Sequence, residues 1–148
     1  MADDTIRKQI LAAWVDYFEA EEWITTGGIS VNPGKTRYKK NEMPGISVFA
    51  GEEESWRDKY GEQDCKVQVE FKYVGLLAVG ADVFQIAEDI RGQLINTAMN
   101  AEDDFSNDRE YAGGTIDYPA SDDEAYQVSI MMNIHYQTLI GNPYEQGD

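Results

Sequence analysis

Two segments of alternating apolar and polar residues constrain the fold of this chain more than any other feature. In the segment from Cys65 to Leu77 the apolar side chains occupy odd positions until about Val74, where both faces turn apolar, and from Tyr126 to Tyr136 an apolar series occupies the even positions. Successive side chains of a strand point to opposite faces of a sheet, so each segment predicts a strand with one buried and one solvated face. A doubly wound parallel sheet is disfavoured, because its strands would be apolar on both faces.

Two helices are predicted to cover the buried face. Residues 6–18 carry an apolar stripe with helical spacing that ends near Trp23, and Asp3, Asp4 or Thr5 can cap its first turn. A second stripe extends from about Asp82 to Asn100. We therefore expect residues 1–148 to form a single α+β domain, a two-layer sandwich. Its sheet would have about four to five strands, mostly antiparallel or mixed, with both amphipathic helices on one face.

The remaining segments are less regular. An irregular hairpin is expected over residues 29–40, turning at Asn32-Pro33-Gly34. A short strand at 46–50 starts after Pro44, which cannot donate into a sheet. Residues 51–64 read as a long polar loop, and residues 100–124 as a connection with a short strand near 114–118.

The residues that carry chemistry are few and scattered. The single cysteine, Cys65, excludes an internal disulfide and a multi-cysteine zinc site, and the single histidine, His135, excludes any site with two imidazoles. The carboxylates lie in polar loops without a spacing that favours acid–base catalysis. Residues 104–115 fail the EF-hand pattern, because Arg109 replaces the glycine and Thr115 the final glutamate, although an irregular divalent-cation site at 103–110 stays open. We expect no enzymatic activity and no cofactor.

The chain is strongly acidic, with a formal net charge of −16. Residues 100–148 hold −10 of it, from eleven acids and one base, and residues 1–99 hold −6. This charge argues against binding nucleic acid or an anionic membrane. The N-terminus lacks the basic patch of a signal peptide, and the longest nearly apolar run, 74–81, is far too short to cross a bilayer. We expect the protein to function in aqueous compartments.

Two features favour contact with other proteins. A basic arm, Lys35, Arg37, Lys39 and Lys40, opposes the overall sign of the chain. It suits either a solvated edge protected by lysines or a docking arm for an acidic surface, including a second copy of the chain. Trp56 lies among charged residues and is either a loop anchor or an exposed contact. The candidate interface residues are Lys35, Arg37, Lys39, Lys40, Glu52, Glu53, Glu54 and Trp56.

The order of these features resembles the bacteriophage tail terminator (minor tail protein U-like) family of long-tailed phages. The resemblance covers about three quarters of the chain and rests on order and pattern, without a signature residue. Four stretches carry it: the helix at 6–18; Met43-Pro44-Gly45-Ile46-Ser47-Val48-Phe49-Ala50-Gly51-Glu52; the strand–helix unit at 67–99; and Ile134-His135-Tyr136-Gln137-Thr138 followed by Gly141-Asn142-Pro143.

This resemblance implies a structural virion protein, assembled in the host cell cytoplasm and located at the head-proximal end of the tail. It would form a hexameric ring that caps the completed tail tube, stops its polymerisation and offers a surface to the head–tail connector or neck protein. The matching contact segments would be the 31–41 arm and the 51–64 loop. Six copies, at −16 each, would carry −96 formal charges, so carboxylates around the lumen would repel passing DNA without binding it.

Two alternatives remain at this stage. One is another phage neck or tail-completion protein of similar fold. The other is a small cytoplasmic ligand-binding or enzymatic α+β domain, with a cavity lined by Tyr73, Trp14 or Tyr136 and containing a buried carboxylate.

Overall fold

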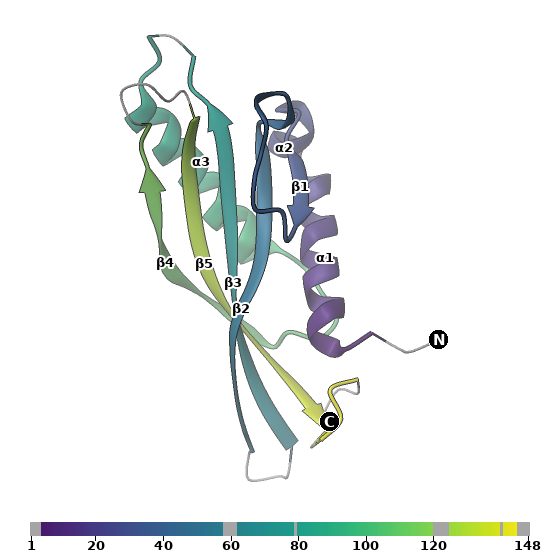
Figure 1. The fold of residues 1–148 in the computed structure, drawn as a ribbon. Coiled ribbons are helices and arrows are strands. Elements are labelled where there is room, and N and C mark those ends of the chain that lie inside the picture. Colours follow the sequence, from purple (N-terminus) through teal and green to yellow (C-terminus); the bar gives the residue numbers. More distant parts are fainter. Residues whose placement is uncertain (1–3, 58–61, 79, 120–124, 140, 145–148) are drawn as a thin grey trace.

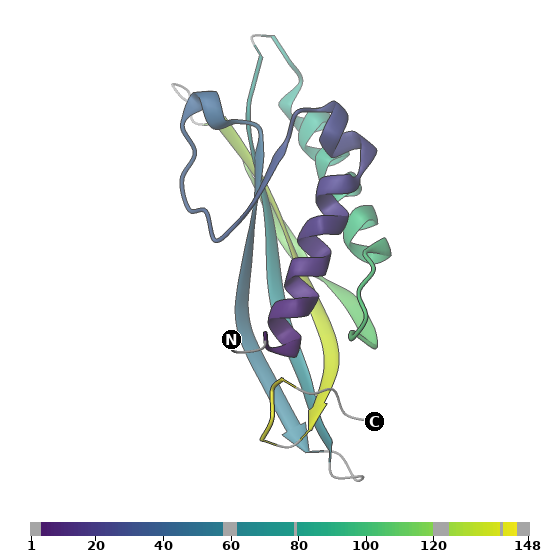
Figure 2. The same ribbon diagram turned by 90° about the vertical axis from the view of Figure 1, so that its right-hand side faces the viewer.

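The computed structural model describes residues 4–57, 62–78, 80–119, 125–139 and 141–144. It has two layers, a twisted mixed sheet and a layer of helices on one of its faces (Figures 1 and 2). This confirms the predicted α+β sandwich. The elements follow the chain as α1 (Ile6–Ala20), α2 (Glu22–Thr26), β1 (Ser30–Pro33), the 3-10 turn η1 (Lys40–Glu42), β2 (Gly45–Arg57), β3 (Glu62–Leu76), α3 (Val83–Asn100), β4 (Asp108–Asp117) and β5 (Ala125–Leu139).

The sheet has the strand order β1-β2-β3-β5-β4, with β1 and β2 parallel and the other neighbours antiparallel. The two alternating segments of the sequence form its centre, because β3 pairs with β5 along their whole lengths. Their apolar phases coincide: Val67 lies opposite Ile134, and Phe71 lies opposite Ile130. One face of the sheet is therefore apolar and packs on the helices, as predicted.

The core joins α1 to the middle of this apolar face. Phe71 is fully buried and stacks on Phe18, with ring centroids 4.6 Å apart, and on Trp14, at 5.9 Å. Thr5 caps α1 by accepting a hydrogen bond from the Lys8 backbone N–H at 3.1 Å. The helix ends at Ala20, earlier than the predicted Trp23, because Glu21 has an extended backbone and α2 starts after it.

Two predicted segments were wrong. Residues 29–40 do not form a hairpin: β1 pairs in parallel with β2, and residues 34–44 cross the outer face of the sheet, opposite the helices (Figure 2). Residues 51–57 and 62–64 are strand and not loop, because β2 continues to Arg57 and β3 begins at Glu62; residues 58–61 lie outside the described residues. The strand near 114–118 is also longer than expected, since β4 begins at Asp108.

A bulge interrupts the pairing of β2 with β3. Ala50 lies opposite Val69 and Glu53 opposite Val67, so two residues of β2, Gly51 and Glu52, face the single residue between these partners. A Cβ on Gly51 would lie 3.4 Å from the Gln68 carbonyl oxygen. The bulge shifts the alternation by one residue, so Glu53 points to the helix side of the sheet and Glu54 to the outer side.

Candidate functional site

The basic arm, Lys35 to Lys40, is fixed to the outer face of the sheet by the ring of Tyr38. The Tyr38 hydroxyl lies 2.8 Å from the buried Ser47 Oγ and accepts a hydrogen bond from Asn32 Nδ2 at 3.2 Å. Ser47 Oγ in turn donates to the Lys35 carbonyl at 2.6 Å. The Tyr38 ring occupies the space that a Cβ on Gly45 would need, so glycine at this position lets the arm lie flat on the sheet.

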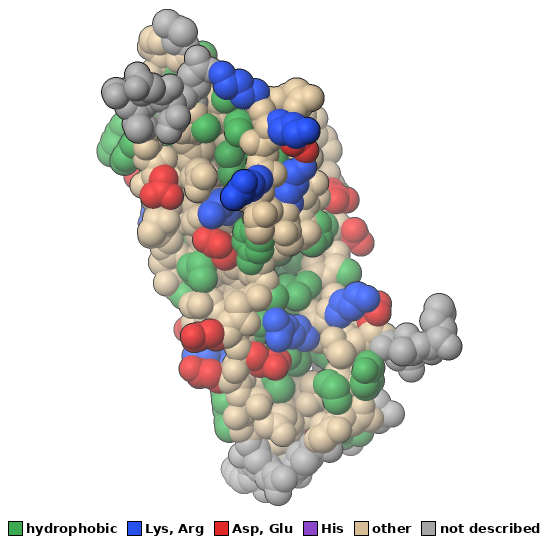
Figure 3. Space-filling view, viewed as in Figure 1, with side chains coloured by type: hydrophobic (Ala, Val, Ile, Leu, Met, Phe, Trp, Pro, Cys, Tyr) green, Lys and Arg blue, Asp and Glu red, His purple; other side chains and the backbone are tan. Residues whose placement is uncertain are grey.

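The four basic side chains of the arm have different roles. Lys35 forms an ion pair with Glu42, and its Nζ lies 5.0 Å from the centre of the Tyr38 ring. Hydrogen bonds from the Lys35 side chain and the Lys39 backbone lower the pKa of Glu42. Arg37, Lys39 and Lys40 are exposed. In Figure 3, Lys and Arg side chains gather over the upper half of the outer face, where the arm crosses β1 and β2. The arm thus presents three exposed cations on a rigid base.

The glutamates of β2 are split between the two faces of the sheet. Glu54 pairs with Lys66 of β3 at 3.2 Å, on the outer face. Glu53 points to the helix side, and Glu52 is exposed at the bulge. Trp56 is 46% exposed near the end of β2. These residues lie at the far end of β2 from Gly45 and Ser47, where the arm is attached, so the structure does not bring the two groups of candidate residues together.

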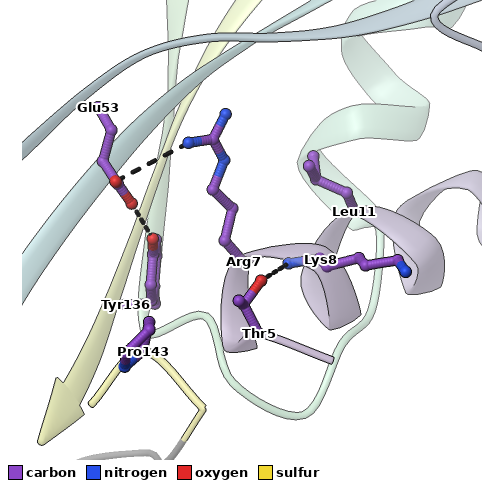
Figure 4. A pocket seen from close by; sticks show the side chains of 7 residues that line it. All are labelled: Thr5, Arg7, Lys8, Leu11, Glu53, Tyr136 and Pro143. Atoms are coloured by element: carbon purple, nitrogen blue, oxygen red, sulfur yellow. Dashed lines mark hydrogen bonds and ion pairs between the residues drawn. The ribbon is translucent and has the colours of Figure 1, made fainter. Parts of the chain in front are cut away.

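Glu53 belongs to a polar cluster that the sequence did not predict (Figure 4). The Tyr136 hydroxyl donates a hydrogen bond to Glu53, and Arg7 Nη1 of α1 lies 3.8 Å from the same carboxylate. Burial, followed by the hydrogen bond to Glu53, raises the pKa of Tyr136. The three side chains line an open cavity of about 330 Å³ with Leu11 and Pro143. They come from three separate elements, and no local pattern connects them.

Segment 103–110, where the sequence leaves an irregular divalent-cation site open, is organised by hydrogen bonds to the Asp103 side chain. The Asp103 side chain is fully buried and accepts from Trp14 Nε1 at 2.8 Å, Phe105 N at 2.8 Å and Ser106 N at 2.6 Å. Arg109 lies 3.9 Å from it and donates to the Ala98 and Ala101 carbonyls at the end of α3. Across the described part of the chain, no three His, Cys, Asp or Glu side chains are grouped to hold a metal. Asp103 is thus a structural carboxylate that ties α1 to the end of α3.

The residues named for a ligand-binding alternative are used in packing or lie on the surface cavity. Trp14 is fully buried between Phe71 and the Asp103 carboxylate. Tyr73 is buried with its ring 5.8 Å from that of Tyr126. Tyr136 borders the open cavity of Figure 4. Cys65 is buried, and burial raises the pKa of its thiol. His135 lies on the outer face, 3.8 Å from Glu110.

The two sides of the sheet differ in charge. The basic arm lies on the outer face over β1 and β2, whereas the edge strand on the opposite side, β4, exposes Asp108, Glu110 and Asp117. Glu102 and Asp104, just before β4, are exposed as well. The single base in this region, Arg109, is turned inward to the end of α3. Exposed cations of the arm thus lie on the β1–β2 side of the outer face, and exposed carboxylates lie on the β4 side.

Comparison with known proteins gives no family assignment: no protein-family model and no curated protein matches the chain. Among the helices of the described residues, none is long and apolar enough to span a membrane.

Proposed function

We propose that this chain is a structural virion protein of a long-tailed phage, a subunit of a hexameric ring that caps the completed tail tube. The ring stops polymerisation of the tube and offers a joining surface to the head connector. Its place is the head-proximal end of the tail, after assembly in the host cytoplasm. The proposal starts from the family resemblance of the sequence and from the two-layer α+β fold.

The observation that carries this proposal is the charge difference between the basic arm, over β1 and β2, and the acidic edge strand β4 on the opposite side of the sheet. A closed ring uses a heterologous contact, in which one surface of a subunit meets a different surface of the next. The cationic arm and the anionic β4 edge supply two such surfaces on opposite sides of one sheet. Complementary charge orients the approaching subunits and opposes contact between like edges. Local attraction of this kind is needed because a net charge of −16 per chain opposes assembly.

Electron microscopy tests the proposal directly. The purified protein is examined by negative stain at high concentration and after mixing with isolated tail tubes. Rings and capped tube ends are the expected result. A chain that stays monomeric at every concentration and leaves tail tubes unchanged would contradict the proposal. Monomers in dilute solution alone would not, because charge repulsion delays assembly until the tube is present.

Reversal of charge on the arm is expected to lower assembly without unfolding the chain. Lys39→Glu combined with Lys40→Glu places two acids opposite the acidic β4 edge of the next subunit. The free energy of unfolding should stay within about 1 kcal/mol of wild type, because exposed side chains contribute little. Sedimentation velocity measures the assembly and urea unfolding measures the stability.

Lys8→Glu is a control for this pair of substitutions. Its side chain is 70% exposed and lies on α1, in the helix layer and outside the basic arm. Assembly should therefore remain near the wild-type level. If the arm variant loses stability in step with assembly, the arm is a structural element and not a contact surface.

A further inference from the structure

Residues 141–144 form a strap that turns back over the helix side of the sheet after β5. Asn142 forms an isolated β-bridge with Leu139, and its N–H donates to the Leu139 carbonyl at 2.9 Å. The Pro143 carbonyl accepts a hydrogen bond at 2.8 Å from the N–H of Ile6, the first residue of α1. The strap therefore connects the end of β5 to the start of α1.

The side chains beneath the strap are buried, although those of the strap itself are not. Cys65, Tyr136 and Thr138 are buried, and together with the strap they line a cavity of about 250 Å³. In the strap, Asn142 is half-buried and the other three residues are exposed. The strap thus covers this end of the sheet without a buried side chain of its own to anchor it.

The strap also separates two cavities. The cavity beneath it adjoins the cavity of about 330 Å³ drawn in Figure 4, because Glu53, Tyr136 and Pro143 line both. Glu53 and Tyr136 belong to strands β2 and β5 of the sheet, whereas Pro143 belongs to the strap. Movement of Pro143 away from the sheet would therefore join the two cavities into one groove, from the first turn of α1 to the end of β5.

We propose that the strap is a displaceable lid that controls access to this groove. Its latch is the hydrogen bond between the Pro143 carbonyl and the Ile6 N–H. The first N–H groups of a helix have no acceptor within the helix, so water can replace Pro143 when the strap opens. Because water takes its place, the loss of this hydrogen bond costs little net free energy. The lid is independent of the proposed ring.

The floor of the groove allows the strap to open without unfolding the sheet. Most of the side chains beneath the strap carry a polar group, namely those of Glu53, Ser55, Gln63, Tyr136 and Thr138. Exposure of polar groups costs less than exposure of an apolar core, because water can hydrogen-bond to them. The hydrogen bond from Tyr136 to Glu53 does not involve the strap, so it is retained in the open form. Opening is therefore expected to be a local event.

Cys65 reports on the strap, because it is the single cysteine of the chain and lies beneath the strap. The full chain is treated with iodoacetamide at one fixed pH. Mass spectrometry then gives the labelling rate as a fraction of the rate in the urea-unfolded chain. Because opening of the strap exposes little surface, the labelling rate should change little at low urea concentrations. Labelling through global unfolding would instead rise steeply with urea from the start.

Two substitutions of the same chemistry assign the opening to the strap. Gly141 has a φ of 74°, a conformation that is unfavourable for a residue with a side chain, so Gly141→Ala destabilises the closed strap. This variant should label about tenfold faster than wild type. Gly34→Ala is the matched control, because Gly34 has the same φ of 74° but lies outside both cavities. Its labelling rate should stay within about twofold of wild type.

Two results would overturn the proposal. The first is a wild-type labelling rate that follows the urea dependence of global unfolding from zero urea upward, since Cys65 is then reached only by unfolding. The second is a Gly141→Ala labelling rate no higher than that of Gly34→Ala, since Cys65 is then reached by a route that does not involve the strap.

Discussion

Asp103→Asn is expected to lower the free energy of unfolding by about 3–5 kcal/mol, the cost of breaking a buried pair. The carboxylate is fully buried, accepts hydrogen bonds from Trp14, Phe105 and Ser106, and lies 3.9 Å from the Arg109 guanidinium. An amide nitrogen at either oxygen position would face an N–H donor and leave it without an acceptor. Urea unfolding measures the loss, and Asp104→Asn is the control, because Asp104 is exposed.

The Asp103 carboxylate also makes the free energy of unfolding depend on pH. Burial raises the pKa of Asp103, but hydrogen bonds from Ser106, Trp14 and Phe105 outweigh it, so the pKa lies below its usual value. The contribution of Asp103 to the free energy of unfolding is therefore complete above the unfolded-state pKa, about 3.9, and is lost as the pH falls through the folded-state pKa. The stability difference between wild type and Asp103→Asn should narrow on acidification. A difference that stays constant down to the lowest pH at which the protein folds would argue against this role.

Phe71→Ala is expected to destabilise the fold by about 3–5 kcal/mol. Its ring is fully buried and stacks on both Phe18 and Trp14 of α1, so the substitution leaves a cavity between the two layers. Thermal unfolding and urea unfolding would both measure this loss of stability. Because Phe71 lies at the centre of β3, the loss should appear as global unfolding and not as fraying of one strand.

Phe84→Ala provides the matched comparison, since the Phe84 side chain is 61% exposed on α3. Its effect should stay within about 0.5 kcal/mol. If the two phenylalanine variants lose similar stability, the stacking of α1 on β3 is not the centre of the core.

The central part of this fold follows from the sequence because burial is one-sided there. β3 and β5 each face the helices on one side and solvent on the other, so their composition alternates with period two. The stripes of α1 and α3 arise for the same reason. Pro44 also marks the start of β2 correctly, because a proline cannot donate into the sheet.

The far half of β2 could not be predicted in this way. Residues 51–57 are polar on both sides of the strand, and the bulge at Gly51 and Glu52 breaks what alternation is left. β1 was also mispredicted: its partner is not the adjacent basic arm but β2, beyond that arm. Local spacing carries no signal for such a pairing.

The candidate contact residues were identifiable by charge, but their surroundings were not. Lys35 is turned toward Glu42, which the run of basic residues does not indicate. The cluster of Arg7, Glu53 and Tyr136 joins three elements that are distant in sequence. Contacts of this kind depend on tertiary packing, so they appear only once the sheet and α1 are placed.

The bulge of β2 also bears on which changes of length this chain can accept. Removing Gly51 would leave one residue opposite Gln68 and restore regular pairing, with Glu53 still across from Val67. Adding a residue at the same place would enlarge the bulge. If β2 then shifted its register against β3 by one residue to remove the bulge, Glu52 or Glu54 would point to the helix side of the sheet. Deletions should therefore be tolerated here more readily than insertions, because β2 already has one residue more at the bulge than regular pairing with β3 requires.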